Sequence, residues 1–250
     1  MLNQVHGDVL PRRLLAFTTL PDEDTAAIEA VGARSQRELL PRRDLVREGD
    51  EPKSVFLILD GWACRYKTLP DGRRQIVSFC IPGDLCDTGI QLLGDMDHGV
   101  AAITRLKLAE IARDDFDALL ANRPRLARAV RCGELIAASI QREWALSLGQ
   151  RTALERIAHL LCETQLRLEV AGLGHGDSCD FPLTQVDLAD ATGLTPVHVN
   201  RTLQELRRCG LIQLQNKKLS IIDKPALRRA ALFNENYLHL GSDTGIQGES

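Results

Sequence analysis

The segment from Leu183 to Ile212, LTQVDLADATGLTPVHVNRTLQELRRCGLI, constrains the fold more tightly than any other part of this chain. It contains two short amphipathic helical patterns on either side of a turn at Gly193. Thr184 is placed to cap the first helix and Thr195 to cap the second, with Pro196 at its first position. The pattern predicts a helix-turn-helix whose second helix enters a DNA major groove, although a helical hairpin inside an ordinary core has the same spacing.

The second helical pattern separates apolar from polar side chains. Val199, Leu203 and Leu206 recur at helical spacing and are expected to face the core. The polar residues left on the outer side include no carboxylate: His198, Asn200, Arg201 and Gln204. An outer surface of this kind is suited to contacts with base edges and phosphates.

The residues after this helix predict a wing. A short strand is expected over Leu211–Leu214 and a return strand over Leu219–Ile222, with Lys217 and Lys218 in the turn between them. Over residues 195–229, eight lysine and arginine residues stand against two acidic residues, a net charge of +6 on a chain whose total is −3. Such concentrated positive charge is typical of a protein that binds a phosphate backbone.

Length and composition favour an intracellular protein of two domains. A chain of 250 residues can bury one large core and a smaller one. No apolar run is long enough to span a membrane, and the N-terminal residues lack a secretory pattern, so a cytoplasmic protein is expected. The seven cysteines are scattered, odd in number and never in a CxxC pair, which favours buried thiols in a reducing compartment over disulfides.

The first half of the chain has the pattern of short antiparallel strands. Turn signals recur at Gly49-Asp50, Asp60-Gly61, Asp71-Gly72 and Gly83-Asp84. Short runs rich in β-forming residues lie between or after them: Val55–Leu59, Trp62–Tyr66, Gln75–Ile81 and Leu106–Ala112. This spacing predicts a small antiparallel barrel or jelly roll, preceded by a helix over Pro21–Ala33.

A long helix is expected from Arg125 to Leu148, after a helical stretch that opens at Arg113. Leu135 and Ile136 form one apolar edge of it, which would pack against the barrel. A second stripe, at alternating steps of three and four residues, predicts a seam for the same helix of a second copy in a parallel homodimer: Val130, Gly133, Ala137, Ile140 and Trp144. The alternative is that this stripe also packs on its own barrel.

The expected fold class is therefore α+β, with an N-terminal jelly-roll barrel, a long dimerisation helix and a C-terminal winged helix-turn-helix. The expected boundaries are 14–124 for the barrel as a sensor domain, 125–148 for the helix and 149–233 for the DNA-binding domain. That last domain would begin with a helix over Thr152–Val170 and a loop over Ala171–Cys179. Residues 234–250, rich in glycine, serine and aspartate, are predicted to form a mobile tail.

In this order, the parts resemble the Crp/Fnr family of bacterial transcription regulators. The phrases LVREGDEPKSVFLILDGWACRY and IPGDLCD and the segment from Leu183 to Ile212 carry the resemblance, which covers roughly residues 14–233. It implies a barrel like a cyclic-nucleotide-binding domain, in which a sensed signal reorients the DNA-binding domains through the dimer helices. The partners it implies are double-stranded DNA with a near-palindromic site, a second copy of the chain and RNA polymerase, with no membrane.

The resemblance also implies individual DNA contacts. Arg201 matches the arginine with which family members contact guanine O6 and N7. Val197 stands where both founding branches have a glutamate, so it cannot accept a hydrogen bond from cytosine and could touch a thymine methyl group instead. Asn200 is a candidate for adenine and His198 for a phosphate or a base edge, while Thr184 and Gln185 match phosphate-contacting positions. The full set of expected DNA-contacting residues is Thr184, Gln185, Thr195, Pro196, Val197, His198, Asn200, Arg201, Gln204, Lys217 and Lys218.

The signal is less well specified. Cyclic-nucleotide-binding members have a glutamate and an arginine after the Gly-Asp turn, whereas here Thr88 and Met96 occupy those positions, which disfavours cyclic AMP. No cysteine precedes Cys64, so the N-terminal cysteine cluster of iron–sulfur members is absent. No cofactor is expected, and the identity of the effector stays open. The residues expected to line the effector pocket are Asp84, Cys86, Thr88 and His98.

Two alternatives remain. Within the family, the chain could respond to a cyclic nucleotide or to oxidation, with Cys132 and Cys209 as candidate redox sensors. Outside it, a jelly roll could hold a metal-dependent enzyme, but such a site needs at least two histidines and a carboxylate, and the barrel region offers only His98. The sequence therefore predicts no enzyme and no metal site. A module that binds only a partner protein would leave the basic wing unexplained.

Overall fold

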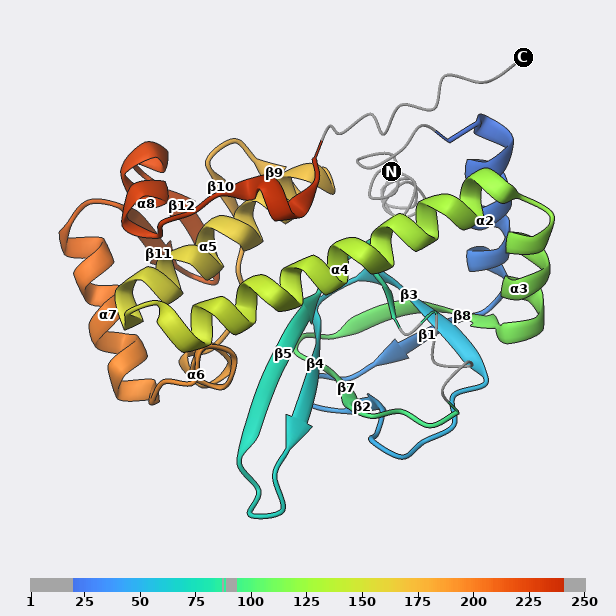
Figure 1. Ribbon diagram of the computed structural model, residues 1–250, viewed down its shortest axis with the longest axis horizontal. Coiled ribbons are helices and arrows are strands. Elements are labelled where there is room, and N and C mark those ends of the chain that lie inside the picture. The colour runs from blue at the N-terminus through green and yellow to red at the C-terminus, as the bar shows by residue number, and fades with distance from the viewer. Residues whose placement is uncertain (1–19, 87, 89–93, 241–250) are drawn as a thin grey trace.

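The computed structural model describes residues 20–86, 88 and 94–240 of the chain. Its helix α4 (Pro124–Gln150) has 27 residues and crosses the molecule, with the N-terminal and C-terminal domains both packed against it (Figure 1). Pro124 occupies the first turn, where its missing N–H leaves no helical hydrogen bond unmade. The helix predicted over Arg125–Leu148 is thus present and slightly longer at both ends.

The N-terminal domain consists of two four-stranded antiparallel sheets that enclose an apolar interior. The first has the order β1 (Gln36–Leu39), β8 (Leu106–Ala112), β3 (Ser54–Asp60), β6 (Leu85–Cys86), and the second the order β2 (Asp44–Val46), β7 (Gly99–Ala102), β4 (Ala63–Thr68), β5 (Arg74–Cys80). The side chains between them include Phe56, Ile58, Val100, Leu106 and Leu108. This confirms the predicted jelly-roll barrel.

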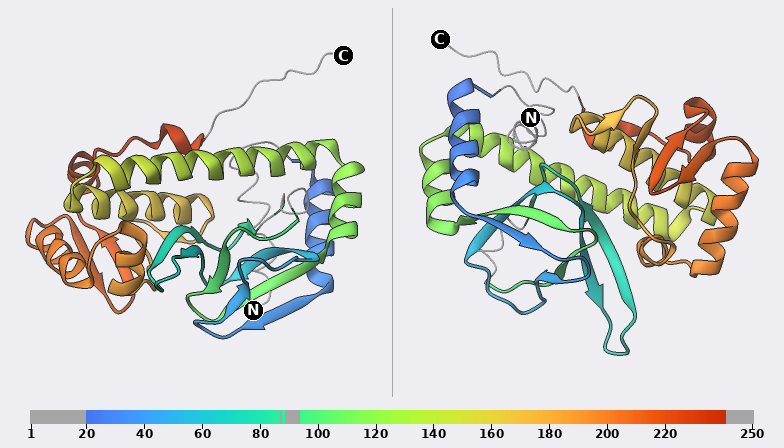
Figure 2. Two further views of the ribbon diagram at one scale, coloured as in Figure 1. Left: turned by 60° about the horizontal axis from the view of Figure 1, so that its bottom comes forward. Right: turned by 180° about the vertical axis from the view of Figure 1, so that it is seen from behind.

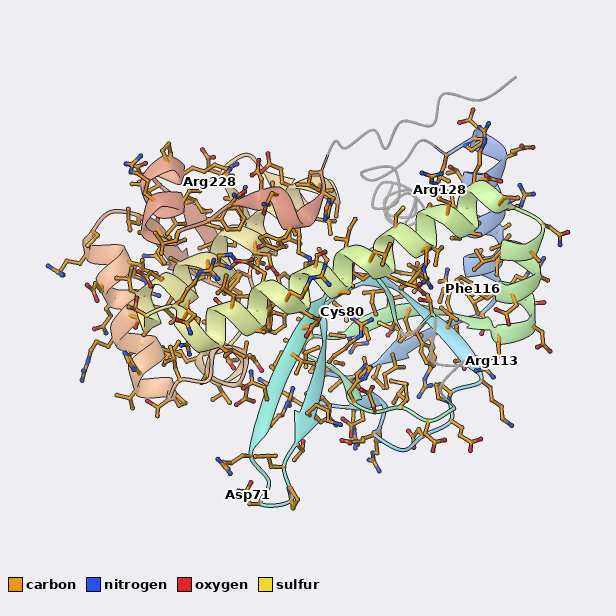
Figure 3. The ribbon with its side chains drawn as sticks, in the orientation of Figure 1. Asp71, Cys80, Arg113, Phe116, Arg128 and Arg228 are labelled. Carbon is orange, nitrogen blue, oxygen red and sulfur yellow. The ribbon has the colours of Figure 1, made fainter. Side chains whose placement is uncertain are left out.

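Three helical segments cover the outer face of the first sheet. They are α2 (Asp22–Arg34), α3 (Arg113–Ala121) and the start of α4, whose apolar side chains form one cluster with the sheet (Figure 3). Phe116 of α3 is fully buried in it, beside Ile28 of α2 and Leu126 of α4. The buried carboxylate of Asp24 accepts a 2.8 Å hydrogen bond from Arg123, which joins α2 to the start of α4.

Burial within the chain contradicts the predicted dimer seam at three of its five residues. Val130, Ile140 and Trp144 are buried against their own chain: the first packs with α2 and α3, and the other two pack on the outer face of the second sheet. Gly133 is half-buried at the margin of the stripe, and Ala137 is exposed. The stripe follows the helical period because it faces the chain's own core, which is the alternative that the sequence left open.

The face of α4 turned away from the core is partly apolar. Leu135, which was expected to pack against the barrel, is 57% exposed, and Leu146 is 48% exposed, whereas Ile136 is buried as predicted. Ala138 and Ala145 are exposed on the same side of the helix. The outward face therefore runs along these four residues rather than along the predicted seam.

The C-terminal domain combines four helices with a small sheet. Its helices are α5 (Ala153–Val170), α6 (Gln185–Thr192), α7 (Pro196–Arg208) and α8 (Lys224–Ala230). Its sheet has the order β11 (Ile212–Gln215), β12 (Lys218–Ile221), β10 (Ser178–Asp180), β9 (Gly174–His175). The predicted loop over Ala171–Cys179 is wrong there, because part of that stretch pairs as β9 and β10 and widens the predicted wing hairpin into a four-stranded sheet.

The two domains lie on either side of the C-terminal half of α4 (Figure 2). They share one apolar cluster with that half of the helix. Trp62 and Phe79 project from the outer face of the second barrel sheet. Phe79 lies edge-on to Trp144 of α4 at 5.8 Å, and Trp62 lies edge-on to Phe181 of the C-terminal domain at 6.2 Å between ring centroids. This aromatic contact fixes how the C-terminal domain sits on the barrel.

The prediction of a mobile segment from residue 234 is wrong over its first residues. A 3-10 helix, η2 (Glu235–Leu238), packs against α4, and both Tyr237 and Leu238 are buried. The two apolar side chains explain the order, because they complete the core between α4 and α5. Residues 241–250 of the predicted tail lie outside the described residues. Over the described residues, no helix is long and apolar enough to cross a membrane.

Candidate nucleic-acid interface

The helix-turn-helix begins with a capping box at the N-terminus of α6. The hydroxyl of Thr184 accepts a hydrogen bond from the backbone N–H of Asp187, and the Asp187 carboxylate accepts one from the backbone N–H of Thr184 at 2.8 Å. Burial raises the pKa of Asp187, but hydrogen bonds from Thr184 and the guanidinium of Arg42 outweigh burial and hold that pKa below its usual value. The Asp187 carboxylate therefore stays ionised at the N-terminus of α6.

The turn and the second helix follow the predicted chemistry. α6 ends at Gly193, which has a φ of +65°, and α7 begins after Thr195, whose hydroxyl accepts a hydrogen bond from the backbone N–H of His198 at 3.2 Å. Val199, Leu203 and Leu206 are buried as predicted. The inward side of α7 is thus fixed against α5 and α6, so the direction of its outer side is fixed as well.

The outer side of α7 carries the predicted polar residues. His198, Arg201 and Gln204 are exposed, and Asn200 is half-buried. Val197 is 71% exposed in the first turn, an apolar group open to solvent among polar neighbours. Arg201 lies four residues after Val197, so the two side chains are neighbours on the surface of α7. The guanidinium of Arg201 offers a planar donor pair for guanine, and Val197 offers a methyl surface for thymine.

The wing turn consists of Asn216 and Lys217, because Gln215 pairs with Lys218 across the hairpin. Both turn residues have positive φ, 51° and 58°, which is the geometry of a type I′ turn. Asparagine adopts it readily, whereas a lysine adopts it at some cost. The side chains of Lys217 and Lys218 are both exposed, and Lys218 makes only a loose ion pair with Asp180, at 3.8 Å.

The predicted DNA-contacting residues thus come from the start of α6, the outer face of α7 and the wing hairpin, where Lys217 is in the turn and Lys218, predicted in the turn, begins β12. Ten of the eleven are exposed, and the half-buried one is Asn200. The packing of α6 and β11 against α7 places the three elements beside one another. The arrangement is chemically suited to phosphate contacts at both ends and base contacts in the middle.

The four residues expected to line an effector pocket do not converge in this way. Asp84 accepts a 2.8 Å hydrogen bond from Arg167 of α5, and Thr88 donates one of 2.6 Å to Glu134 of α4. Cys86 is buried in the barrel interior, whereas His98 lies beside Asp97 at 2.6 Å. The hydrogen bonds of Asp84 and Thr88 instead join the barrel to α5 and α4, respectively.

No group of three histidine, cysteine or carboxylate side chains is placed to hold a metal ion within residues 20–86, 88 and 94–240. The cysteines in the same part of the chain are thiols and form no disulfide. Cys209 is exposed and Cys132 is half-buried, while the other five are buried: Cys64, Cys80, Cys86, Cys162 and Cys179.

Sequence reasoning missed a set of contacts between the barrel and α6. Arg42, in the β1–β2 turn, donates to both carboxylate oxygens of Asp187, at 2.7 and 3.3 Å. Arg74 of β5 lies 3.9 Å from Asp190, and Gln75 donates to the backbone carbonyl of Ala191 at 3.2 Å. These pairs are more than a hundred residues apart in the chain, and no local pattern marks them.

Comparison with known proteins identifies both domains. Residues 36–123 match the cyclic nucleotide-binding domain, and residues 155–230 match the Crp-like helix-turn-helix domain. Nitrogen fixation regulation protein FixK of Bradyrhizobium diazoefficiens is 35% identical over 176 residues, which cover 70% of this chain and 73% of that protein. Transcriptional activator protein FnrL of Cereibacter sphaeroides is 29% identical over 220 residues, covering 86% and 87%.

A solved structure has the same fold. FixK2 from Bradyrhizobium japonicum superimposes with a TM-score of 0.70 at 23% identity, over 78% of this chain and 96% of that one. The similar proteins are named as regulators rather than as enzymes, so the alternative of a metal-dependent jelly-roll enzyme has no support. The chain therefore belongs to the Crp/Fnr family of DNA-binding transcription regulators.

Proposed function

We propose that this regulator reads a near-palindromic promoter site as a homodimer, with Arg201 as its principal base contact. The observation that carries this proposal is the outer face of α7, where Arg201 is exposed between the N-terminus of α6 and the basic wing. Val197, in place of an acidic residue, favours thymine over cytosine at the neighbouring base. The target is therefore distinct from the sites of members that have a glutamate at that position.

The test is selection of bound duplexes from a random pool, followed by titration of single-base variants. Arg201→Ala should remove discrimination at one position of each half-site, at a cost of about 1–3 kcal/mol. Lys218→Ala is the matched control, because loss of a phosphate contact weakens binding to all sequences alike. Unchanged discrimination by Arg201→Ala would exclude this role.

The second copy is expected on the outward face of α4, not on the stripe predicted from the sequence. A helix of 27 residues is about 40 Å long, and its small residues Ala138 and Ala145 allow a second helix to approach closely between Leu135 and Leu146. Leu135→Glu should raise the dimer dissociation constant at least tenfold in sedimentation. Leu69→Glu, at a leucine that is 51% exposed on the β4–β5 hairpin, should leave it unchanged.

Control by the barrel would pass through the contacts that Asp84 and Thr88, which follow β5, make with the helices. Thr88 is bonded to Glu134 of α4 and Asp84 to Arg167 of α5, so a ligand that moves this segment would shift both helices. We assign RNA polymerase as a further partner, because the similar protein FnrL is named a transcriptional activator and an activator must recruit or position the polymerase. We assign the cytoplasm as the location. Transcription in vitro from a selected site, with polymerase and this protein alone, tests that assignment.

A further inference from the structure

The β1–β2 turn of the barrel reaches the entry of the helix-turn-helix. Its residue Arg42 has a φ of +64°, an unusual conformation for a side-chain-bearing residue, which is held by a 2.8 Å hydrogen bond from its N–H to the carbonyl of Ala102. The turn is closed by a bond from the Arg43 N–H to the Leu40 carbonyl, at 3.3 Å. The barrel therefore presents Arg42 and Arg43 from a fixed backbone.

Arg42 lies within two hydrogen bonds of the residue expected to contact phosphate. The Oδ2 atom of Asp187 accepts from Nη2 of Arg42 at 3.3 Å, from the N–H of Thr184 at 2.8 Å and from its hydroxyl at 2.6 Å. One carboxylate oxygen thus joins the guanidinium to the N-terminus of α6. A phosphate held at that terminus lies within the reach of an arginine side chain.

The charges on this part of the surface favour an anion. The carboxylates of α6 would repel phosphate, but both are faced by arginines of the barrel, Asp187 by Arg42 and Asp190 by Arg74. The Arg42 side chain is still 52% exposed, so the ion pair leaves much of its guanidinium open. Arg43 is exposed and makes no ion pair with the described residues, which leaves its charge unneutralised.

We propose that the DNA interface extends from the helix-turn-helix onto the barrel, where Arg42 and Arg43 contact phosphates that flank the sequence read by α7. This inference rests on the proposed function, because it places DNA on α6 and α7. The flanking contact is independent of base sequence, since guanidinium groups in this position meet only the backbone. It requires a duplex that continues beyond the selected site.

The experiment compares two duplexes, one trimmed to the selected site and one with about ten further base pairs on each side. Binding is measured across a range of salt concentrations for the wild type, Arg43→Ala and Arg201→Ala. Arg43→Ala keeps the Arg42–Asp187 pair, so it preserves the capping of α6. The control Arg113→Ala removes the same charge at the far side of the barrel from α7, at the start of α3 (Figure 3).

On the long duplex, Arg43→Ala should reduce the slope of log K against log salt by about 0.9 for each lost phosphate contact. On the trimmed duplex, Arg43→Ala and the wild type should bind alike, and Arg113→Ala should match the wild type on both. Arg42→Ala should reduce the slope similarly, with circular dichroism as the check that α6 remains folded.

Equal slopes for the wild type and Arg43→Ala on the long duplex would overturn the inference, as would a defect in transcription without any defect in binding. The latter result would assign the turn to a protein partner. These outcomes are distinct from failure of the proposed function, in which neither the wild type nor Arg201→Ala would discriminate between sequences on either duplex.

Discussion

The hydroxyl of Tyr237 donates a 2.9 Å hydrogen bond to the fully buried carboxylate of Glu163. The same carboxylate accepts from the indole N–H of Trp144, at 3.1 and 3.2 Å, and lies 3.8 Å from a guanidinium nitrogen of Arg167. Burial raises the pKa of Glu163, and these partners offset the effect only in part. One buried acid therefore joins α4, α5 and the segment after α8.

Tyr237→Phe should reduce the free energy of unfolding by about 1–3 kcal/mol, because it removes a donor from a buried carboxylate and leaves the ring in place. Urea denaturation followed by tryptophan fluorescence measures the loss. Tyr66→Phe is the matched control, since Tyr66 donates to Asp44 at 2.8 Å in a half-buried position and should cost less. Equal costs for the two variants would contradict a special role for the buried acid.

His159 should make the protein less stable as the pH falls. Its ring is buried beside Phe233 and Tyr237, and burial, together with the Arg151 cation, lowers its pKa to about 3. Glu143 Oε1 lies 3.3 Å from the imidazole but is already bonded to Arg151 at 2.6 Å, so it does not reverse the shift. Between about pH 6.5 and 3 the unfolded chain binds a proton that the folded chain does not. The free energy of unfolding therefore decreases as the pH decreases through this range.

His159→Phe should retain the ring packing and remove this pH dependence. Between pH 7.5 and 5.5 the wild type should lose about 1.4 kcal/mol more than the variant, measured by urea denaturation at each pH. The exposed His198 gives the control, because His198→Phe should leave the wild-type pH dependence unchanged. A variant as sensitive to pH as the wild type would show that another group is responsible.

Gly61 and Gly72 allow a comparison of two turns. Both have positive φ, 84° and 88°, but a Cβ at Gly61 would lie 2.2 Å from the carbonyl oxygen of Arg105, whereas a Cβ at Gly72 would meet nothing within 4 Å. Gly72→Ala should cost about 1–2 kcal/mol for the backbone alone. Gly61→Ala should cost about 1–3 kcal/mol more, because the backbone must move. Similar melting temperatures for the two variants would rule out the clash.

Cys209 is expected to be the thiol through which peroxide affects DNA binding. It is exposed at the end of α7, and oxidation to a sulfenic acid, with release of water, would add a polar group behind that helix. Burial raises the pKa of Cys64 and Cys162 to about 12 and that of Cys179 to about 11, so these thiols stay unreactive. Peroxide should weaken gel-shift binding of the wild type and of Cys132→Ser but not of Cys209→Ser.

Local chemistry made much of the fold predictable. Thr184 and Thr195 cap the helices that their positions predicted, and β8 has the predicted bounds Leu106–Ala112. The stripe of Val130, Ile140 and Trp144 was correctly recognised as apolar, but spacing along a helix does not state which partner covers each edge. For that reason the sequence placed Val130, Ile140 and Trp144 on the outward face of α4 and Leu135 on its inward face, the reverse of the observed burial.

The remaining errors have the same origin. β9 and β10 contain two and three residues, too few to show a strand pattern. β10 forms because β12 offers an edge to pair with, and β9 pairs in turn with β10. Tyr237 lay in a stretch of loop-like composition, and its order depends on Glu163, which is distant in sequence. The Arg42–Asp187 pair likewise depends on how two domains meet. The spacing of apolar residues and the capping residues predict individual helices and strands. Contacts between residues distant in sequence determine what each helix or strand packs against.

The turn at Asn216 and Lys217 has a consequence for how this protein can be improved. Glycine at position 217 would relieve the left-handed backbone and should stabilise the wing, but it would also delete a cation from the surface offered to DNA. A search for heat-resistant variants would therefore collect replacements at this position that fold better and regulate worse. Thermal stability favours glycine at position 217, whereas affinity for DNA favours lysine, so a screen must measure both properties.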